Sequence, residues 1–358
     1  MTTAFIELRS DTFTTPCPAM REAIARAEVG DDVWGEDPTV VRLERRVAGL
    51  LAKQEGLFVP SGTMANQIAL AVHTHHGDEV LVGQGSHCYV YEGGAGAALS
   101  GVQFKLIGSG GVYVAADVEA ALSPDDVHFA RPSLVWLENT HNQGGGRVFR
   151  QADVEAVAEL ARRHGMAVHL DGARLLNAAV ATGRSPGELA GPVDSSSICL
   201  SKGLGAPVGS VLVGDAAFIA RARRIRKRLG GAMRQVGVLA AAGLYALEHN
   251  VERLAQDHEL ARLLARGLSQ LPGVEVAPNG VETNIVMFDL DGTAPSALIR
   301  TCLQRGLRTS TSPQARTRRT STPASRIPVP PRSATPCSST PMATASRMPA
   351  RAAWRMSP

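Results

Sequence analysis

Short apolar runs alternate with stretches of helical periodicity between residues 57 and 213, and this alternation limits the fold more than any other feature of the sequence. Each run has the length and composition of a buried strand. The expected strands cover residues 57–59, 79–82, 104–107, 134–138, 167–170, 198–200 and 210–213. Strands and helices in alternation predict an α/β fold with a doubly wound, mainly parallel sheet.

Helical periodicity and capping residues place the helices. They are expected at residues 18–28, 39–53, 64–75, 151–164, 235–247 and 252–271, and Asp37 and Pro38 signal the start of the second. Residues 284–288 follow as a strand of a smaller C-terminal α+β domain. We therefore expect an N-terminal arm over residues 1–16, a large domain over 17–248 and a partial small domain over 249–308.

The last part of the chain, residues 309–358, has a different composition. It holds eight arginines, no lysine, aspartate or glutamate, and only two aliphatic β-branched residues, Ile327 and Val329. Such a segment cannot bury enough apolar surface to fold, so we expect it to be disordered. It is either a natural tail or the product of a reading-frame slip near residue 308. We favour the slip, because Arg, Pro, Ala, Ser and Thr dominate a GC-rich gene that is read out of frame.

Charge and cysteine content exclude several classes of protein. The net charge of +4 comes from the tail: without its eight arginines, 37 − 8 = 29 basic residues face 33 acidic ones. We therefore expect no nucleic-acid surface. Five scattered cysteines without a C-x-x-C pair predict neither a disulfide framework nor a metal site. The chain shows no export signal and no apolar run long enough for a membrane span, so we expect a cytoplasmic protein.

Polar residues follow several of the expected strands, at the point where each strand ends. Ligands of doubly wound sheets bind at the carboxyl ends of the strands. The residues in these places are Ser61-Gly62-Thr63, His87, Glu138-Asn139, Asp171 with Arg174, and Lys202. The first group opens a helix, whose free N–H groups could seat a phosphate, although Ser-Gly-Thr is also a common N-cap.

Lys202 stands between the apolar run 197–200 and a glycine-rich turn. A partly desolvated amine can attack a carbonyl and form a Schiff base. The alternative is a lysine whose stem packs while its ammonium group stays in water, and by itself the stretch leaves both readings open.

The polar residues at the strand ends match the needs of one cofactor. Pyridoxal phosphate needs a lysine that can form a Schiff base, a carboxylate at its ring nitrogen, a ring that stacks on it and a phosphate seat. Because Lys202, Asp171, His87 and the turn 61–63 supply all four, we favour this cofactor. A dinucleotide is disfavoured, since the turn lacks the G-x-x-G spacing.

The motifs of the chain resemble those of the low-specificity L-threonine aldolases, which are fold-type-I enzymes dependent on pyridoxal phosphate. The resemblance extends from residue 6 to about residue 308. The matching segments are LRSDT at 8–12, VGDDVWGEDPTV at 29–40, SGTMAN at 61–66, LENTHN at 137–142, HLDGAR at 169–174, SKGLGAPVGS at 201–210 and MRQ at 233–235. The resemblance implies a fold of the PLP-dependent transferase type, with residues 17–248 binding the cofactor.

The resemblance also implies roles for single residues. Lys202 would form the Schiff base with the cofactor, and Asp171 would pair with the pyridine nitrogen. His87 would stack on the ring and, directly or through a water, remove the proton of the substrate hydroxyl, for which an imidazole is suited at neutral pH. Arg174 would contact the phenolic oxygen of the cofactor and, with Ser10, the substrate carboxylate.

Phosphate contacts and assembly are implied in the same way. Gly62 and Thr63 would hold the phosphate, and Lys227 and Arg234 would supply charge to it from a neighbouring subunit. A shared site implies a homo-oligomer, a dimer or a tetramer. The implied reaction cleaves the Cα–Cβ bond of a β-hydroxy-α-amino acid such as L-threonine, leaving glycine and an aldehyde.

The chain departs from the family pattern in three places. Trp34 replaces a tyrosine, Ala232 replaces a glycine, and no carboxylate-binding arginine followed by a Thr-His pair occurs after residue 308. Two alternatives to an active aldolase therefore stay open. One is an impaired or non-catalytic product that binds the cofactor, and the other is a different reaction on the same scaffold, such as transamination or β-elimination.

Overall fold

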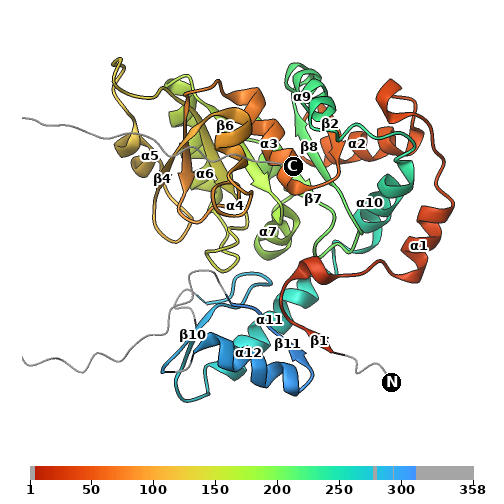
Figure 1. Ribbon diagram of the computed structural model, residues 1–358, viewed down its shortest axis with the longest axis vertical. Helices are drawn as coiled ribbons and strands as arrows, with labels where there is room; N and C mark the ends of the chain where they lie inside the picture. The colour runs from red at the N-terminus through yellow and green to blue at the C-terminus, as the bar shows by residue number, and fades with distance from the viewer. Residues whose placement is uncertain (1–4, 277–279, 293, 312–358) are drawn as a thin grey trace, which may run out of the picture. The chain divides into compact units, whose positions relative to one another are not determined.

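A seven-stranded sheet forms the centre of the computed structural model, which describes residues 5–276, 280–292 and 294–311 (Figure 1). The strand order is β2-β8-β7-β6-β5-β3-β4. β8 runs antiparallel to both of its neighbours, and the other neighbouring pairs are parallel. The strands are β2 (Glu55–Val59), β3 (Glu79–Gly83), β4 (Gln103–Ile107), β5 (Pro132–Glu138), β6 (Ala167–Gly172), β7 (Ser195–Cys199) and β8 (Ser210–Gly214). The expectation of a mainly parallel α/β sheet is confirmed, and most strands are a little longer than expected.

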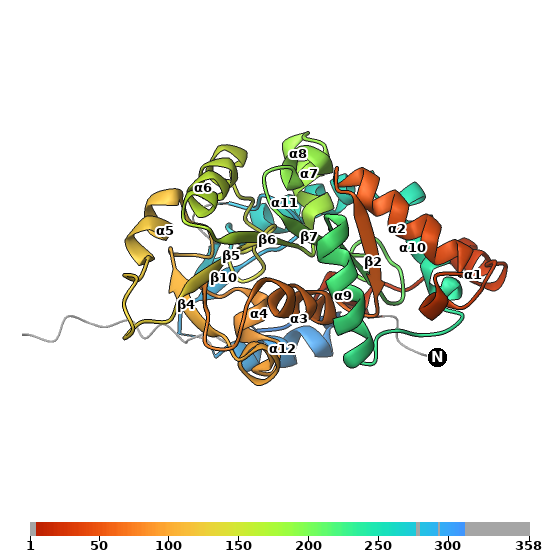
Figure 2. The ribbon, with the colours of Figure 1, turned by 90° about the horizontal axis from the view of Figure 1, so that it is seen from above.

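Helices cover both faces of this sheet (Figure 2). Side chains alternate along each strand, so neighbouring residues enter different cores. In β5, Val135 and Leu137 join one core while Leu134 and Trp136 join the other. The helices are α1 (Pro18–Ala25), α2 (Pro38–Leu50), α3 (Gly62–His73), α4 (His87–Val90), α5 (Ala115–Ala121), α6 (Gln151–Arg163), α7 (Leu175–Thr182), α8 (Pro186–Ala190), α9 (Ala216–Arg228), α10 (Gly237–His249), α11 (Leu254–Leu268) and α12 (Pro295–Gln304). The first core takes residues from α2, α6 and α10, and the second takes them from α3 and α9.

The C-terminal region pairs with the N-terminal arm. β9 (Val274–Val276) and β10 (Phe288–Leu290) form an antiparallel pair, and β1 (Ile6–Glu7) pairs in parallel with β11 (Leu307–Arg308). The expected strand at 284–288 was wrong in its position, because the backbone pairing with β9 begins only at Phe288; ahead of it, the side chain of Asn284 binds Asp11. The domain boundaries stay a prediction, and the expectation of disorder for 309–358 lies, from residue 312 on, outside the described residues.

Asp37 joins the starts of two helices. Its Oδ1 accepts hydrogen bonds from the N–H groups of Thr39 and Val40 in α2, each at 3.1 Å. Its Oδ2 accepts from the N–H groups of Gly237, the first residue of α10, at 2.8 Å and of Gly30 at 3.2 Å. The side chain is buried, so these four bonds replace its water.

Replacing Asp37 by alanine is expected to lower the free energy of unfolding by about 2–4 kcal/mol, because two helix starts lose their acceptor inside the protein. Urea unfolding measures the change. Asp215→Ala is the matched control, since Asp215 is an exposed N-cap that accepts one bond from Phe218, and it should cost about 1 kcal/mol. Equal losses in the two variants would contradict the double role of Asp37.

A polar cluster lies inside the second core. Ser195 Oγ is 2.7 Å from His73 Nε2 and 2.7 Å from His169 Nδ1. The ring of His73 stacks on Phe218, with centroids 4.8 Å apart. Burial lowers the pKa of His73 to about 4 and that of His169 well below its ordinary value. Both imidazoles are therefore neutral in the folded chain at neutral pH.

This cluster predicts a loss of stability in weak acid. Between pH 6.5, the ordinary pKa of histidine, and about pH 4, the unfolded chain binds a proton at His73 but the folded chain does not. The free energy of unfolding therefore decreases as the pH falls through this range. His73→Phe should reduce the slope of unfolding free energy against pH in this window by up to about 1.4 kcal/mol per pH unit. Urea unfolding at several pH values measures it, with the exposed His128→Gln as control. An unchanged slope in His73→Phe would contradict the assignment.

Candidate active site

The carboxyl ends of the parallel strands carry the residues that the sequence singled out. β6 ends at Asp171 and Gly172, and β5 ends at Glu138. α4 begins at His87 shortly after β3, and Lys202 lies in the turn after β7. β2 runs parallel to these strands, because β8 is antiparallel to both β2 and β7, and it leads into α3 at Gly62. One edge of the sheet therefore presents these side chains.

Asp171 is buried and keeps room for a further hydrogen-bond donor. Its Oδ1 accepts from the N–H of Ala173 at 3.0 Å, and its Oδ2 accepts from Nδ2 of Asn66, in α3, at 2.8 Å. A carboxylate has about four lone-pair positions, so each oxygen can take one more donor. The arrangement suits a ring N–H placed against Asp171.

His87 contacts two carboxylates. Its backbone N–H donates to Oε2 of Glu138 at 2.7 Å, and its Nδ1 lies 2.8 Å from Oε1 of Glu92. The side chain is 32% exposed, and its ring lies 5.4 Å from that of Tyr91, measured between centroids. The imidazole is thus held on one side and open on the other.

Arg174 is buried and bound by the N-terminal arm. Its Nε and Nη2 donate to the two oxygens of Asp11 at 2.8 and 2.7 Å, and its Nη1 donates to Oδ1 of Asn142 at 3.2 Å. Asn284 Nδ2 also donates to Asp11, at 3.0 Å. Burial alone would raise the pKa of Asp11, but Arg174 outweighs it and holds that pKa below its ordinary value. Of the five N–H groups of the guanidinium, one on Nη1 and one on Nη2 remain for another acceptor.

Ser10 lies beside this ion pair. It is exposed, and its hydroxyl accepts from the N–H of Thr12, so that it caps the short helical turn Asp11–Phe13. Its expected contact with a substrate carboxylate stays a prediction, and its neighbour Asp11 is the residue that reaches Arg174.

The turn around Lys202 packs against the arm and against α3. Thr14 Oγ1 donates to the carbonyl oxygen of Lys202 at 2.7 Å. Within the described part of the chain, no hydrogen bond or ion pair engages Nζ of Lys202, so no other side chain competes for this amine. A Cβ on Gly62 would lie 2.8 Å from Sγ of the buried Cys199, and only glycine allows α3 to begin this close to β7.

The first turn of α3 is a candidate phosphate seat. Ser61 Oγ accepts from the N–H of Met64 at 3.1 Å, which leaves the N–H groups of Gly62 and Thr63 without an intrahelical acceptor. Backbone N–H groups at a helix start bind phosphate well. The segment after α9 packs against this first turn, because a Cβ atom on Gly231 would clash with Sδ of Met64.

Within the described residues, no hydrogen bond or ion pair joins Lys227 or Arg234 to this seat. Lys227 is exposed on α9, and Arg234, with a 60% exposed side chain, pairs with Asp31 at 2.9 Å. Their expected role at a neighbouring subunit's phosphate stays a prediction.

The residues present fit pyridoxal phosphate. Lys202 offers an amine without a partner, Asp171 offers a carboxylate with spare acceptor positions, and the start of α3 offers free N–H groups. Over residues 5–276, 280–292 and 294–311, no group of three or more His, Cys, Asp or Glu side chains is placed to hold a metal ion. The same part of the chain contains no helix that is long and apolar enough to cross a membrane.

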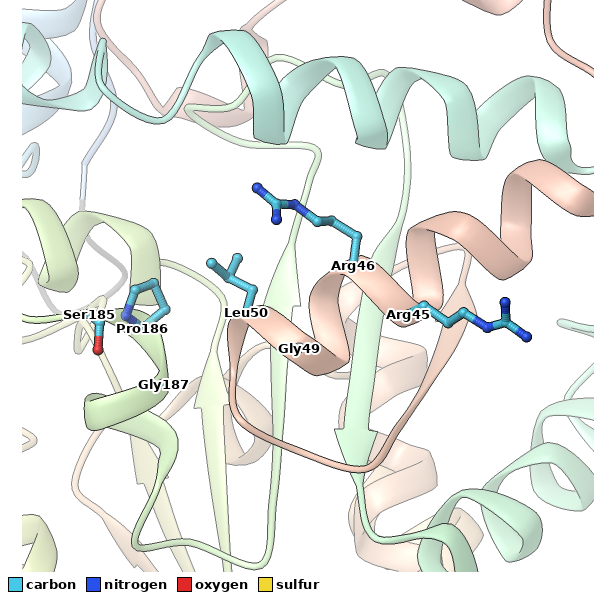
Figure 3. Close-up of a pocket in the computed structure, with 7 residues that line it drawn as sticks. All are labelled: Arg45, Arg46, Gly49, Leu50, Ser185, Pro186 and Gly187. Carbon is cyan, nitrogen blue, oxygen red and sulfur yellow. The ribbon is translucent and has the colours of Figure 1, made fainter.

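A surface pocket of about 530 Å³ lies elsewhere, between α2 and α8 (Figure 3). In the figure Arg45 and Arg46 point away from each other, and the other side of the pocket is formed by Pro186 and Gly187 of α8 with its N-cap Ser185. The pocket shares no residue with the strand-end constellation. We therefore place the candidate site at the strand ends and not in this pocket.

Sequence reasoning missed four residues of the site. Asp11, Asn66 and Asn142 lie inside motifs that the sequence analysis quoted without giving them roles, and Glu92 lies outside every motif. A useful signal was present for Asp11, since an acidic residue next to the expected substrate ligand Ser10 could have been paired with Arg174. Glu92 had no such signal.

The fold and the strand-end constellation define a fold-type-I protein of the pyridoxal-phosphate class. A family model described as beta-eliminating lyase matches residues 7–292, and the chain belongs to this family. It is 47% identical over 291 residues to low-specificity L-threonine aldolase 1 of Arabidopsis thaliana, covering 80% of this chain and 81% of that protein. It is 48% identical over 267 residues to the low specificity L-threonine aldolase of Escherichia coli strain K12, covering 74% and 79%.

Solved structures share the fold. The threonine aldolase of Leishmania major superposes with a TM-score of 0.73 at 23% identity, covering 84% of this chain and 88% of that one. The expectations for the fold class, the family and the cofactor are confirmed.

Proposed function

We propose that this protein is a threonine aldolase that cleaves L-threonine and L-allo-threonine to glycine and acetaldehyde with pyridoxal phosphate as its cofactor. The observation that carries the proposal is the free amine of Lys202 on the same sheet edge as the buried Asp171, in a chain 47–48% identical to curated low-specificity threonine aldolases. Bound pyridoxal phosphate supplies an electron sink for the cleavage of the Cα–Cβ bond.

The proposal gives each side chain of the site a role that its position supports. Lys202 holds the cofactor covalently, and Asp171 keeps its ring nitrogen protonated, because a buried carboxylate favours a positive neighbour. His87 would face the cofactor ring and accept the proton of the substrate hydroxyl. Arg174 presents its two free N–H groups to the substrate carboxylate and the cofactor, with Ser10 beside it. Gly62 and Thr63 hold the phosphate.

Our proposal includes a cytoplasmic homo-oligomer, a dimer or a tetramer, in which Lys227 and Arg234 serve the phosphate of a neighbouring subunit. The exposed amine of Lys227 supports it, and so does Trp34, which is 76% exposed near the Asp31–Arg234 pair. The four cysteines of the described residues are free thiols, as a reducing compartment would keep them. Light scattering of the purified protein measures the assembly.

The test of the function is to purify the chain with pyridoxal phosphate and to measure acetaldehyde released from L-threonine and L-allo-threonine. We expect a yellow protein that releases acetaldehyde and glycine in equal amounts. A yellow protein that releases neither would favour an impaired cofactor-binding product, or a transamination or β-elimination on the same scaffold. A colourless protein would reject the cofactor assignment.

A further inference from the structure

Glu92 is a buried carboxylate that three side chains contact. Its Oε1 accepts from Asn66 Nδ2 at 2.8 Å, and its Oε2 accepts from Gln67 Nε2 at 2.6 Å. Nδ1 of His87 lies 2.8 Å from the same Oε1. The Glu92 side chain is fully buried, so these three groups replace its hydration.

The amide of Asn66 determines which groups donate in this network. Its Nδ2 is 2.8 Å from Glu92 Oε1 and 2.8 Å from Asp171 Oδ2, so its two protons point to two carboxylates. A flipped amide would set its carbonyl oxygen against both of them and would be repelled. Asn66 therefore couples the carboxylate beside His87 to the carboxylate proposed for the cofactor's ring nitrogen.

The hydrogen bonds of the Glu92 carboxylate determine the tautomer of His87. A carboxylate has no proton to donate, so the hydrogen bond between Nδ1 and Oε1 requires the proton on Nδ1. The neutral ring then carries its lone pair on Nε2. No hydrogen bond within the described residues engages Nε2, and the ring is a third exposed, so this nitrogen is available to a substrate.

We infer that Glu92 is a positioning residue, which holds His87 with its proton on Nδ1 so that Nε2 accepts the β-hydroxyl proton of the amino-acid substrate. This inference rests on the proposed function, since it assigns the base of that reaction. Glu92 itself touches neither the substrate nor the cofactor in this arrangement.

The surrounding charges support the same arrangement. Burial pushes the pKa of His87 down, but the hydrogen bond to Glu92 and the charges of Asp171 and Glu138 raise it above its ordinary value. A stronger base near neutral pH accepts a hydroxyl proton more readily. Among the described residues, Glu92 in the turn after α4, Asp171 in β6 and Glu138 in β5 are the charged groups that raise the pKa of His87, and the phenol ring of Tyr91 contacts the imidazole.

The first experiment reads the tautomer directly, without turnover. In the full-length protein labelled with ¹⁵N-histidine, both without and with pyridoxal phosphate, the two-bond ¹H–¹⁵N spectrum distinguishes a protonated ring nitrogen from a bare one. His87→Asn identifies the signals of His87 among those of ten histidines. We expect a protonated Nδ1 and a bare Nε2 above the pKa of His87. The opposite tautomer would overturn the inference.

The second experiment removes the charge of Glu92 at nearly constant shape. In Glu92→Gln we expect the pKa of His87 to fall by about one unit or more and the tautomer signals to mix. The kcat should fall about tenfold to a thousandfold, the acidic limb of its pH profile should move down with the pKa, and KM should change little. Glu92→Asp should restore part of each effect.

The control is Glu79→Gln, because Glu79 is also a buried carboxylate, at the start of β3, and pairs with Lys105 outside the site. It should leave the His87 signals and kcat unchanged. If Glu92→Gln leaves the His87 tautomer and the pH profile unchanged, Glu92 has only a structural role. The same conclusion holds if Glu92→Asp folds but restores neither the pKa of His87, nor its tautomer, nor kcat. If the unchanged chain shows the expected tautomer but releases no acetaldehyde, the proposed function fails while the Glu92–His87 assignment stands.

Discussion

Lys202→Ala is expected to remove the visible absorption of bound pyridoxal phosphate and to lower acetaldehyde release from L-threonine by about 10⁴-fold or more, the scale on which loss of a covalent nucleophile acts. The fold should survive, because the backbone bond from Thr14 goes to the carbonyl oxygen of residue 202 and not to the removed side chain. Absorption spectra and a coupled acetaldehyde assay measure both effects.

The other lysines of the chain supply the control. Besides Lys202 the sequence holds three: Lys53, Lys105 and Lys227. Lys105→Ala removes an amine that pairs with Glu79 away from the site, so it should keep the absorption and the activity. Borohydride reduction followed by peptide mass analysis should find the cofactor on Lys202. Finding it on another lysine would refute the assignment.

Asp171→Asn is expected to lower kcat by about a hundredfold or more and to weaken cofactor binding. The variant keeps the shape of the side chain but removes the charge that favours a protonated ring nitrogen. It also breaks one of the two bonds from Asn66 and Ala173, because an amide on residue 171 cannot accept at both of its ends. Equilibrium dialysis against pyridoxal phosphate and steady-state kinetics separate the two losses.

Asp194→Asn controls for the loss of a charge elsewhere on the same sheet. Asp194 lies just before β7, at the end of the sheet opposite to Lys202, and accepts a bond from the N–H of Val168 at 2.7 Å. We expect it to change the unfolding free energy slightly and kcat not at all. If Asp171→Asn also retained full kcat, the ring nitrogen would need another partner.

The strands of the large sheet and its helices α1, α2, α3, α6 and α10 were predictable because their signals are local, whereas α5, α7, α8 and α9 were not predicted. An apolar run bounded by turn residues forms a strand in almost any context, and Asp37 and Ser61 cap α2 and α3 as their residue types suggest. The strand at 284–288 was misplaced because its partner β9 pairs only with Phe288–Leu290, and a short apolar pattern does not show where a partner strand will lie. The helix α4 has only four residues, too few for a helical pattern to be recognised in the sequence.

Some residues of the candidate site could likewise be identified from the sequence, and others could not. Lys202, Asp171 and His87 could be selected because each follows an expected strand, and the parallel sheet gathers strand ends at one edge. Asp11 and Arg174, by contrast, are 163 residues apart, and Glu92 and Asn66 are 26 apart. No pattern within a segment links such pairs.

By itself, the sequence determined that this chain would form a mainly parallel α/β sheet with a lysine, a carboxylate and an imidazole at its carboxyl edge. These features depend on local propensity and on the order of strands. The tertiary structure alone decided which atoms those residues would present. Asp11 binds Nε and Nη2 of Arg174, and Glu92 selects the tautomer of His87. Both contacts form because a buried polar group must satisfy its hydrogen bonds with the neighbours that the fold places beside it.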